Sequence, residues 1–283
     1  MATLELIQRP LRPSDRRRVL EISAGVWDGH DYLPEVFDEW VQDPGANFQG
    51  VELEGVVVGI QRLRPIAPGI LFMEGMRVDA ALQGRGIGSE MARMAIAGAR
   101  EQDFRELRLV TANPVAVHLF ESLGFALISS LQSWVAPRSE EGELERLPDE
   151  SQLAGIWEGL ADDPDAADYG GVNADWQAPL DLGLDLLRSL QTEGRVRVSG
   201  AGRALALVGD EGRERLRVTH LSGSAAPLQH LLSDLRFEAD AHDLVGVSLL
   251  LPAEHRARQA LEHVGYDLAN DPAWRLRFYR LSL

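Results

Sequence analysis

The chain contains neither cysteine nor lysine among its 283 residues. The absence of cysteine excludes disulfides, a thiolate nucleophile and zinc sites built on sulfur ligands. The absence of lysine excludes the Gly-Lys-Ser/Thr end of a phosphate-binding P-loop. It also leaves the α-amine as the one ordinary amine of the chain that could itself be acylated. All 28 basic residues are therefore arginines.

Long apolar segments are missing as well. No run approaches 18 consecutive apolar residues, the length that spans a bilayer, and no apolar segment of a secretory signal precedes Arg16. We therefore expect a cytoplasmic protein. The formal net charge of −16 repels phosphates and anionic lipid, so neither nucleic acid nor a membrane is expected as a partner. The seven histidines show no metal-ligand spacing, and no metal site is expected.

Two short segments recur along the chain and indicate an internal repeat. The sequence AGVWDG at 24–29 returns as AGIWEG at 154–159, and LFESLGF at 119–125 is echoed by ALEHVGY at 260–266. The spacing grows between the two pairs, which requires an insertion in the second copy, for which the Asp- and Gly-rich loop 161–171 is a natural place. We predict two domains of one fold.

The predicted domains are 1–138 and 143–283, joined by a charged linker at 137–147. Each copy reads as a helix, a Trp-containing loop, strands, an amphipathic helix, a strand, a short helix and a last strand pair. The pattern predicts an α/β (α+β) class with mixed central sheets flanked by helices. In the first copy the strands are expected at 51–64, 70–79 and 105–111, and the helices at 89–102 and 114–123. Their counterparts in the second copy are expected at 195–208, 214–221 and 244–251, and at 225–239 and 253–264.

A glycine-rich turn follows the strand that ends near Val78. Its sequence, QGRGIGS at 83–89, carries glycines at alternate positions, and a helix is expected to begin near Ser89. Glycines allow close approach of the backbone, and successive N–H groups at a helix N-terminus suit a pyrophosphate. A dinucleotide fingerprint would need glycine where Ser89 stands. A purely structural turn is the alternative.

Two motifs resemble the coenzyme A motifs of the GNAT acetyltransferase superfamily. They are Gln83-x-x-Gly86-x-Gly88 and Asn113-x-x-Ala116-x-x-x-Phe120-x-x-x-Gly124-Phe125. The resemblance implies tandem acyl-coenzyme A N-acyltransferase domains that use acetyl-coenzyme A. It implies a pantetheine site on Met76, Arg77 and Val78, and a groove lined by Asn113 and Phe120. It further implies that the pyrophosphate is held by Gln83, Gly84, Arg85, Gly86, Ile87, Gly88 and Ser89. Residues 29–34 with Trp40 and 74–78 also look like the histidine N-acetyltransferase subgroup.

The transferred acyl group needs a neutral amine as its nucleophile. For an α-amine with a pKa near 8, deprotonation at pH 7 costs about 1.4 kcal/mol. Positioning can supply roughly 7–11 kcal/mol, so it should dominate over a general base. Glu74 is the candidate base, because alternation along the strand puts it on one face with Phe72, Met76 and Val78. A structural pair with Arg62, Arg64 or Arg77 is the alternative.

Phe120 departs from the superfamily, which usually has a tyrosine there that protonates the leaving thiolate. The departure raises a second hypothesis, an acyl-coenzyme A-binding pseudoenzyme or sensor with little turnover; plain core packing is another interpretation of Phe120. Trp27, Asp31 and Tyr32, together with Glu74, are the candidate acceptor-binding residues, since carboxylates and aromatics suit a cationic amine. The alternative for these residues is helix capping and packing.

The second copy lacks the turn. An offset of 141 places Ser224–Gln229 opposite it, with no glycine triplet and with Pro227, which has no N–H donor. We expect the domain 143–283 to bind no coenzyme A and either to complete the acceptor pocket or to stabilise the first domain. The expected function is direct transfer of acetyl, in a ternary complex, to a primary amine of a small molecule such as an amino acid, by a monomer or homodimer.

Overall fold

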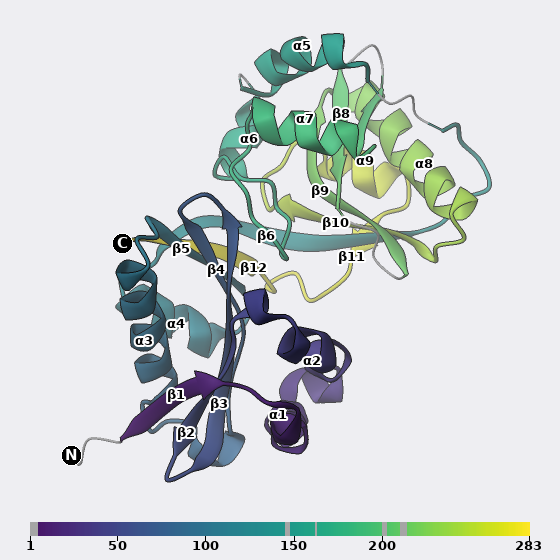
Figure 1. Ribbon diagram of the computed structural model, residues 1–283. Coiled ribbons are helices and arrows are strands. Elements are labelled where there is room, and N and C mark those ends of the chain that lie inside the picture. Colours follow the sequence, from purple (N-terminus) through teal and green to yellow (C-terminus); the bar gives the residue numbers. More distant parts are fainter. Residues whose placement is uncertain (1–4, 145–147, 162, 200–202, 210–213) are drawn as a thin grey trace. The chain divides into compact units, whose positions relative to one another are not determined.

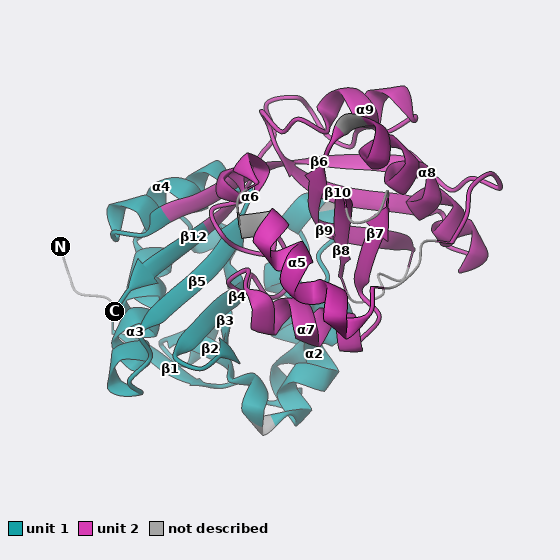
Figure 2. Ribbon diagram, turned by 90° about the horizontal axis from the view of Figure 1, so that it is seen from above, with its two compact units in different colours: residues 1–126, 279–283 teal, residues 127–278 magenta. Residues whose placement is uncertain are grey.

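The computed structural model describes residues 5–144, 148–161, 163–199, 203–209 and 214–283. Its contacts divide the chain into two compact units, which Figure 2 colours separately. The first unit comprises Met1–Ala126 and Tyr279–Leu283, and the second comprises Leu127–Phe278. This division differs from the predicted domain limits at both ends of the second copy. The strand after Ala126 already belongs to the second unit, and the last five residues return to the first.

The first unit is built on a mixed sheet with the strand order β1-β2-β3-β4-β5, in which only β4 and β5 are parallel. Its strands are β1 (Leu6–Pro10), β2 (Phe48–Leu53), β3 (Val56–Ala67), β4 (Ile70–Val78) and β5 (Glu106–Thr111). Its α-helices are α1 (Arg16–Ser23), α2 (Leu33–Gln42), α3 (Ile87–Glu101) and α4 (Pro114–Ser122), and its short 3-10 turns are η1 (Pro13–Asp15), η2 (Val26–Gly29), η3 (Pro44–Ala46) and η4 (Ala80–Leu82).

Helices cover both faces of this sheet, with α3 and α4 on one face and α1 and α2 on the other (Figure 1). The long helix α3 carries its buried residues at helical spacing, from Met91 and Ala92 through Ala95 and Ile96 to Ala99. This apolar stripe packs on β3, β4 and β5, which is what the amphipathic pattern predicts. The predicted positions of this helix and of the strands β4 and β5 are confirmed within two residues. The single strand predicted over 51–64 is wrong, because the turn at 54–55 divides this segment into β2 and β3.

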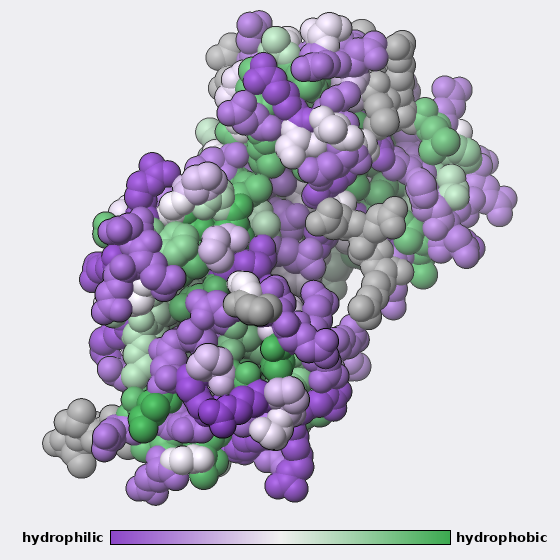
Figure 3. Space-filling model, viewed as in Figure 1, coloured by the Kyte–Doolittle hydropathy of each residue, from purple (hydrophilic) through white to green (hydrophobic). Residues whose placement is uncertain are grey.

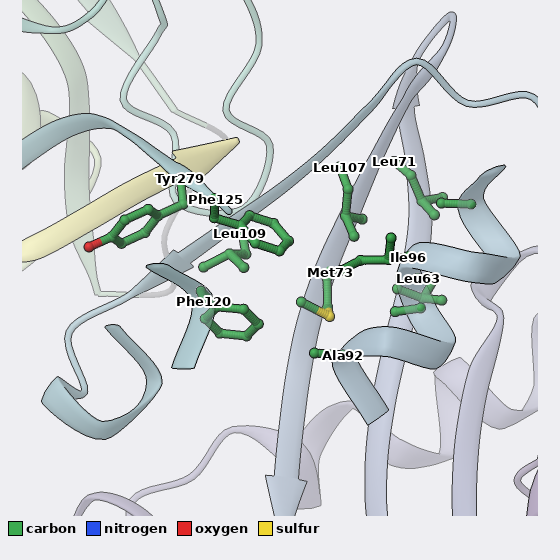
Figure 4. Packing of buried hydrophobic residues seen from close by; sticks show 12 residues of the cluster. Leu63, Leu71, Met73, Ala92, Ile96, Leu107, Leu109, Phe120, Phe125 and Tyr279 are labelled. Carbon is green, nitrogen blue, oxygen red and sulfur yellow. The ribbon is translucent and has the colours of Figure 1, made fainter. Parts of the chain in front are cut away.

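The end of the chain completes the core of the first unit. The last strand, β12, runs over Leu276–Ser282, and its Tyr279 is fully buried. Figure 4 shows Tyr279 next to Phe125 and Leu109 in the cluster that α3 and α4 cover. The Tyr279 hydroxyl donates a hydrogen bond of 2.7 Å to Glu121 Oε1 of α4, and the Leu283 N–H donates one of 2.9 Å to the Arg105 carbonyl.

Strand β4 contains a bulge at Gly75 that reverses the alternation of its side chains. Ile60 of β3 pairs with Arg77 and Arg62 pairs with Glu74, so two residues of β4 lie opposite one residue of β3. Gly75 has φ +63°, and a Cβ there would lie 3.2 Å from the Trp40 ring. Our expectation that Glu74, Met76 and Val78 share a face is wrong for this reason.

Instead, Glu74 and Arg77 point to the α1–α2 side of the sheet, while Met76 and Val78 pack with Ile87 and Met91 on the α3 side.

The second unit repeats the same order of elements on its own sheet, β6-β10-β9-β8-β7. Strands β9 and β10 are parallel, as β4 and β5 are in the first unit, and the other pairs are antiparallel. The strands are β6 (Ala126–Pro137, its first residue in the first unit), β7 (Val196–Ser199), β8 (Ala204–Val208), β9 (Arg215–Gly223), β10 (Gly246–Pro252) and β11 (Asp267–Leu268). The helices are α5 (Glu150–Ala161), α6 (Pro164–Asp168), α7 (Leu184–Thr192), α8 (Ala225–Ala241) and α9 (Arg258–His263).

The two copies differ most in the connection between a central strand and the long helix. In the first unit eight residues, 79–86, separate β4 from α3, whereas in the second unit Ser224 alone separates β9 from α8. The alignment of Ser224–Gln229 with the glycine turn is therefore wrong, because those residues begin a helix and the turn has no counterpart. The loop expected at 161–171 contains α6.

The described ranges contain neither a helix that could span a membrane nor a cluster of metal-binding side chains. None of their helices is long and apolar enough to cross a membrane. They also bring together no group of three His, Asp or Glu side chains that could hold a metal ion. On the face shown in Figure 3, hydrophilic residues surround small groups of apolar ones.

Candidate active site

The glycine turn leaves the end of β4 and leads into α3. Gly84 and Gly86 have φ +77° and +84°, the left-handed conformation that side chains disfavour, and Gly86 is the residue at which α3 begins. The N–H groups of Ile87, Gly88 and Ser89 occupy the first turn of α3, where a helix provides no acceptors for them. The helix begins two residues earlier than predicted, which adds Ile87 and Gly88 to this row of donors.

Open space lies beside the turn. A Cβ built on Gly84 or on Gly86 would have no other atom within 4 Å. Gly88 is different, because a Cβ there would lie 3.5 Å from Met76 Cε and 3.8 Å from Val78 Cγ2. The third glycine thus sets the helix close to β4, whereas the first two shape the turn and keep its outer side clear.

Asp79 fixes the start of the turn. Its Oδ1 accepts a hydrogen bond of 2.9 Å from the Ala81 N–H, and its Oδ2 accepts one from the Arg18 guanidinium. Arg18 in turn donates to the Val57 carbonyl at 2.9 Å, which ties α1, β3 and the turn together. The hydrogen bond from Arg18 lowers the pKa of Asp79 below its usual value. Sequence reasoning missed this anchor, because nothing in the sequence pairs residue 18 with residue 79.

The predicted groove residues on α4 have structural partners. Asn113 is exposed and caps α4, with its Oδ1 accepting a hydrogen bond of 2.9 Å from the Val115 N–H. Phe120 is only 5% exposed and packs edge-on against Phe125, with 5.2 Å between ring centroids. Phe120 is therefore part of the core that Figure 4 shows, and its ring has no proton to give.

The candidate base, Glu74, is held by two arginines on the α2 side of the sheet. Its Oε1 accepts hydrogen bonds of 3.1 Å from Arg62 Nη1 and of 3.1 Å from Arg64 Nε. The Glu74 side chain is 13% exposed, and the Arg62 guanidinium also stacks 4.3 Å from the centroid of Trp40. The structural pair considered as an alternative is thus present. Both bonds go to one carboxylate oxygen, so Oε2 is the oxygen that could accept a proton.

The candidate acceptor residues are assembled around Arg77. Its Nε and Nη2 donate to the two carboxylate oxygens of Asp31 at 2.9 Å and 3.0 Å. The rings of Trp27 and Tyr32 lie 5.1 Å and 5.7 Å from the same guanidinium. Trp27 is 59% exposed and has φ +49°, an uncommon conformation for a bulky residue. The predicted acceptor residues are therefore neighbours, but the carboxylate of Asp31 is committed to Arg77.

Tyr32 links this group to the bulge in β4. Its ring lies 6.0 Å from Trp27 on one side and 6.0 Å from Trp40 on the other. Burial raises the pKa of the Tyr32 hydroxyl to about 12, although the nearby Arg77 guanidinium and a hydrogen bond from the Gly75 backbone lower it. The hydroxyl therefore stays protonated near neutral pH.

Of the residues that matter at this site, the Arg77 side chain and Gly75 were missed. Arg77 was considered for its backbone and as a possible partner of Glu74, but not as the partner of Asp31 that holds the acceptor loop in place. The signal for Gly75 was present, since a glycine inside a strand pattern indicates a bulge or a close backbone approach.

Buried aromatic side chains of the second unit pack beside an irregularity in β9. In β9 the register shifts near Val218, and His220 next to this irregularity is fully buried against Tyr169, with 4.5 Å between ring centroids. His255 Nε2 lies 2.9 Å from the Leu221 carbonyl.

The first unit is thus an α/β unit in which a turn with unpaired backbone donors connects a bulged strand to a helix, on a mixed sheet covered by helices. The model of the acetyltransferase (GNAT) family matches residues 15–125. The N-alpha-acetyltransferase RimI of Mycobacterium tuberculosis is 32% identical over 119 residues, which are 41% of this chain and 75% of that protein. The chain belongs to the GNAT acetyltransferase family.

A relative and a structure match over greater lengths. The human Probable N-acetyltransferase 16 is 26% identical over 216 residues, 67% of this chain and 58% of that protein, so the chain spans little more than half of this relative. A GCN5-related N-acetyltransferase from Sphaerobacter thermophilus shares the fold with a TM-score of 0.64 at 12% identity, over 99% of this chain and 97% of that chain. The predicted class, two tandem GNAT-like domains with mixed sheets, is confirmed.

The narrower likeness to histidine N-acetyltransferases rests on a short match. The histidine N-acetyltransferase of Xenopus tropicalis is 28% identical over 79 residues, 28% of this chain and 24% of that protein. The family implies acetyl-coenzyme A, and the glycine turn fits its pyrophosphate, because the outer side of Gly84 and Gly86 is clear and backbone donors lie beside it.

Proposed function

We propose that the first unit binds acetyl-coenzyme A and transfers the acetyl group to a primary amine of a small molecule, an amino acid or a similar compound. The observation that carries this proposal is the glycine turn at 83–89, with two left-handed glycines and an open outer side. Three or four hydrogen bonds from the turn to a charged phosphate, each worth roughly 1.5–3 kcal/mol, would account for micromolar affinity.

The proposed cofactor path continues along β4. Backbone groups of Met76–Val78 would bind the pantetheine arm beyond the bulge, where the alternation of the strand is interrupted. Gln83 Nε2 donates to the Val78 carbonyl at 3.3 Å, which holds the first residue of the turn against the end of that strand. When bound, the cofactor supplies the activated acetyl thioester. The chain itself positions this thioester relative to the residues that are proposed to bind the acceptor amine.

The acceptor face is proposed to be the group around Arg77. The exposed ring of Trp27 offers a stacking surface to a cationic amine, and Glu74 Oε2 offers it a hydrogen-bond acceptor. Glu74 Oε2 would take the amine proton, directly or through water, while Arg62 and Arg64 hold the other oxygen. The amine then attacks the thioester in a ternary complex.

The leaving thiolate receives its proton from solvent in this proposal. The superfamily's usual tyrosine is replaced by Phe120, which is buried and cannot donate. A coenzyme A thiolate is a fair leaving group, so the loss of a specific acid slows the reaction without preventing it. Holding the reactants in place supplies the larger part of the acceleration, roughly 7–11 kcal/mol.

The names of two relatives support the proposed class of acceptor. One is named an N-alpha-acetyltransferase and another a histidine N-acetyltransferase, and both names describe acetylation of an amino-acid nitrogen. An α-amine with a pKa near 8 is deprotonated at pH 7 at a cost of only about 1.4 kcal/mol, against about 4.6 kcal/mol for a lysine-like amine. An α-amine is therefore easier for a weakly assisted site to acetylate than a lysine-like amine.

The second unit is proposed to bind no coenzyme A. Its strand-to-helix connection is Ser224 alone, so a phosphate-binding turn cannot form. We propose that it stabilises the first unit through the end of the chain, since Tyr279–Leu283 lie in that unit.

The test compares two glycines with matched backbones. Gly86 (φ +84°) and Gly55 (φ +79°) both have no atom within 4 Å of an added Cβ, but Gly55 lies in the β2–β3 hairpin. Both Gly86→Val and Gly55→Val introduce similar strain, about 1–2 kcal/mol. Only Gly86→Val should weaken coenzyme A binding in calorimetry, by tenfold or more. Equal affinity in both variants would remove the basis of the proposal.

The alternative, a coenzyme A-binding sensor with little turnover, is favoured by the replacement of tyrosine at Phe120. Release of free thiol from acetyl-coenzyme A with a panel of amino acids and other amines separates the two functions. Turnover supports the enzyme, whereas tight binding of coenzyme A without thiol release for any amine supports the sensor. Phe120→Tyr is a useful companion variant, because it restores the donor at that position.

A further inference from the structure

Tyr32 differs from the other tyrosines of the chain, which has four. The Tyr32 side chain is only partly buried. The other three are at most 1% exposed: Tyr169, Tyr266 and Tyr279. The ring of Tyr32 lies between Trp27 and Trp40, with 6.0 Å between ring centroids on each side. Because the two flanking rings restrict the orientation of this ring, the hydroxyl of Tyr32 is held at a defined place.

This hydroxyl lies at the bulge of β4. A hydrogen bond with the Gly75 backbone lowers the pKa of Tyr32 and so favours its ionised form, which means that the Gly75 N–H donates and the Tyr32 oxygen accepts. The pairing of β3 with β4 skips Gly75 and Met76, as expected at a bulge, so the Gly75 N–H is taken up by a side chain. The proton of the Tyr32 O–H group therefore points away from Gly75.

The edge of β4 that faces β5 is open beyond Met73. The ladder with β5 ends at this residue, whereas β4 continues to Val78. The Asp79 N–H bonds to a carbonyl of β3, so the alternation of an antiparallel ladder turns the backbone groups of Met76 and Val78 away from β3. These backbone groups are the ones proposed to bind the pantetheine arm.

The proposed cofactor path leads to the Tyr32 hydroxyl. It starts at the turn 83–89 and runs back along Val78 and Met76, so the acyl end of the arm reaches β4 at Gly75. Gly75 is also the residue whose N–H bonds to the Tyr32 oxygen. A thioester that ends the arm at the bulge is therefore next to the Tyr32 hydroxyl.

Two charged groups lie close to this hydroxyl. Burial raises the pKa of Tyr32 to about 12, while the Arg77 guanidinium lowers it and the Glu74 carboxylate raises it. The guanidinium lies 5.7 Å from the centroid of the Tyr32 ring. A hydroxyl with so high a pKa donates a hydrogen bond without losing its proton. Such a donor, with a positive charge nearby, suits an oxygen that becomes negative during a reaction.

We propose that Tyr32 is a catalytic residue that donates a hydrogen bond to the carbonyl oxygen of the acetyl thioester. This inference rests on the proposed function of the first unit. When the amine nitrogen bonds to the carbonyl carbon, the C=O group becomes C–O⁻ and the hydrogen bond from Tyr32 strengthens. The C=O bond then forms again and the C–S bond breaks. The amine proton goes to Glu74 Oε2, the thiolate takes a proton from solvent, and Tyr32 keeps its own proton throughout.

The first test is the infrared spectrum of acetyl-coenzyme A, isotope-labelled at the acetyl carbonyl and bound to the full chain without an acceptor amine. A hydrogen bond to a carbonyl oxygen lowers its stretching frequency, so the band should move to higher frequency in Tyr32→Phe. Tyr279→Phe is the matched control, because it removes a hydroxyl of the same unit that bonds to Glu121 on α4. The band of this control should coincide with that of the wild type.

The second test is the rate of acetyl transfer. Tyr32→Phe should lower kcat by about a hundredfold, the usual cost of removing one donor to an oxyanion. The KM for acetyl-coenzyme A should rise by no more than about tenfold, because a hydrogen bond to the uncharged thioester is weaker. Phenylalanine keeps the ring between Trp27 and Trp40, so the variant should fold, and its melting temperature checks this. A kcat equal to that of the wild type would overturn the proposal.

The infrared result separates this inference from the proposed function. If the wild type binds acetyl-coenzyme A in calorimetry and its carbonyl band is the same in Tyr32→Phe, the role of Tyr32 is wrong while the proposed cofactor site stands. If the wild type binds no acetyl-coenzyme A, the proposed function fails and this inference fails with it. The spectrum needs no turnover, so it also decides the role of Tyr32 as a carbonyl donor in a protein that binds the cofactor and reacts slowly.

Discussion

The guanidinium of Arg77 donates two hydrogen bonds to the carboxylate of Asp31, of 2.9 Å and 3.0 Å. The Asp31 side chain is 2% exposed and that of Arg77 is 15% exposed, so this is a buried pair between the loop before α2 and the bulged strand β4. A third donor of Arg77, Nη1, bonds to the Met76 carbonyl at 3.0 Å. One side chain therefore joins the loop that carries Trp27 and Tyr32 to the strand proposed to hold the cofactor.

Asp31→Ala should destabilise the protein by about 3–5 kcal/mol, because it leaves the buried Arg77 without its partner. The measurement is urea unfolding followed by tryptophan fluorescence. Glu90→Ala serves as a control, since the Glu90–Arg93 pair is about half exposed and should be worth at most about 1 kcal/mol. If Asp31→Ala costs no more than Glu90→Ala, the pair does not hold the loop. In the folded variant the KM for the acceptor should rise more than the KM for acetyl-coenzyme A.

Glu74→Gln tests the proposed proton acceptor. Glutamine keeps an oxygen that can accept the hydrogen bonds of Arg62 and Arg64 but cannot take a proton from the amine. We expect kcat to fall by about a hundredfold or more, which is the usual contribution of a general base. The dependence of the rate on pH should also differ from that of the wild type. A profile identical to that of the wild type would leave Glu74 with a structural role alone.

The strongest local patterns in the sequence were sufficient to predict the central elements. The apolar spacing along α3 and the glycines at 84, 86 and 88 predicted the strand, turn and helix, because these signals depend on neighbouring residues. The bulge at Gly75 and the pair between Asp31 and Arg77 could not be deduced in the same way. They depend on which distant segments meet, and a one-residue shift in register moves every later side chain to the other face of the strand.

The second copy shows the same limit in a different form. Short similar segments indicated the repeat, but applying the single offset of 141 to the glycine turn hid a deletion and an insertion. The connection before α8 is seven residues shorter than its counterpart, eight against one, and an extra helix, α6, lies elsewhere. The predicted absence of a coenzyme A site there stays a prediction, now supported by the missing turn.

His220 should make the stability of the protein sensitive to acid. Burial and, to a smaller extent, the nearby His255 together lower the pKa of His220 to about 3, against a value near 6.5 in the unfolded chain. Between pH 6.5 and pH 3 the unfolded chain binds a proton that the folded protein does not, so the free energy of unfolding falls as the pH falls. The slope is about 1.4 kcal/mol per pH unit for this group.

His220→Leu should remove that slope. Denaturant unfolding at pH 7 and at pH 5 would measure it, with the wild type losing about 2 kcal/mol more than the variant between the two values. His242→Leu, at an exposed residue that caps the end of α8, is the control and should behave as the wild type does. Identical losses in the wild type and in His220→Leu would show that His220 is protonated in the folded state as readily as in the unfolded chain.

Tyr279→Ala should loosen the first unit although the residue is encoded near the end of the chain. The buried ring packs in the cluster with Phe125 and Leu109, and its loss should cost about 3–5 kcal/mol. Hydrogen exchange followed by mass spectrometry should show faster exchange in α3 and α4. Tyr266→Ala, an equally buried tyrosine bonded to the Leu232 carbonyl, should instead affect α8 and α9. Faster exchange confined to α8 and α9 in both variants would contradict this assignment.

The place of Tyr279–Leu283 in the first unit has a consequence for biosynthesis. A ribosome delivers the sheet, the turn and α4 of this unit long before it delivers the strand that closes their core. The core of the first unit therefore stays incompletely packed while the whole of the second unit is translated. Emergence of residues 279–283 from the ribosome, and not emergence of residue 126, is therefore the point at which the first unit can reach its final structure.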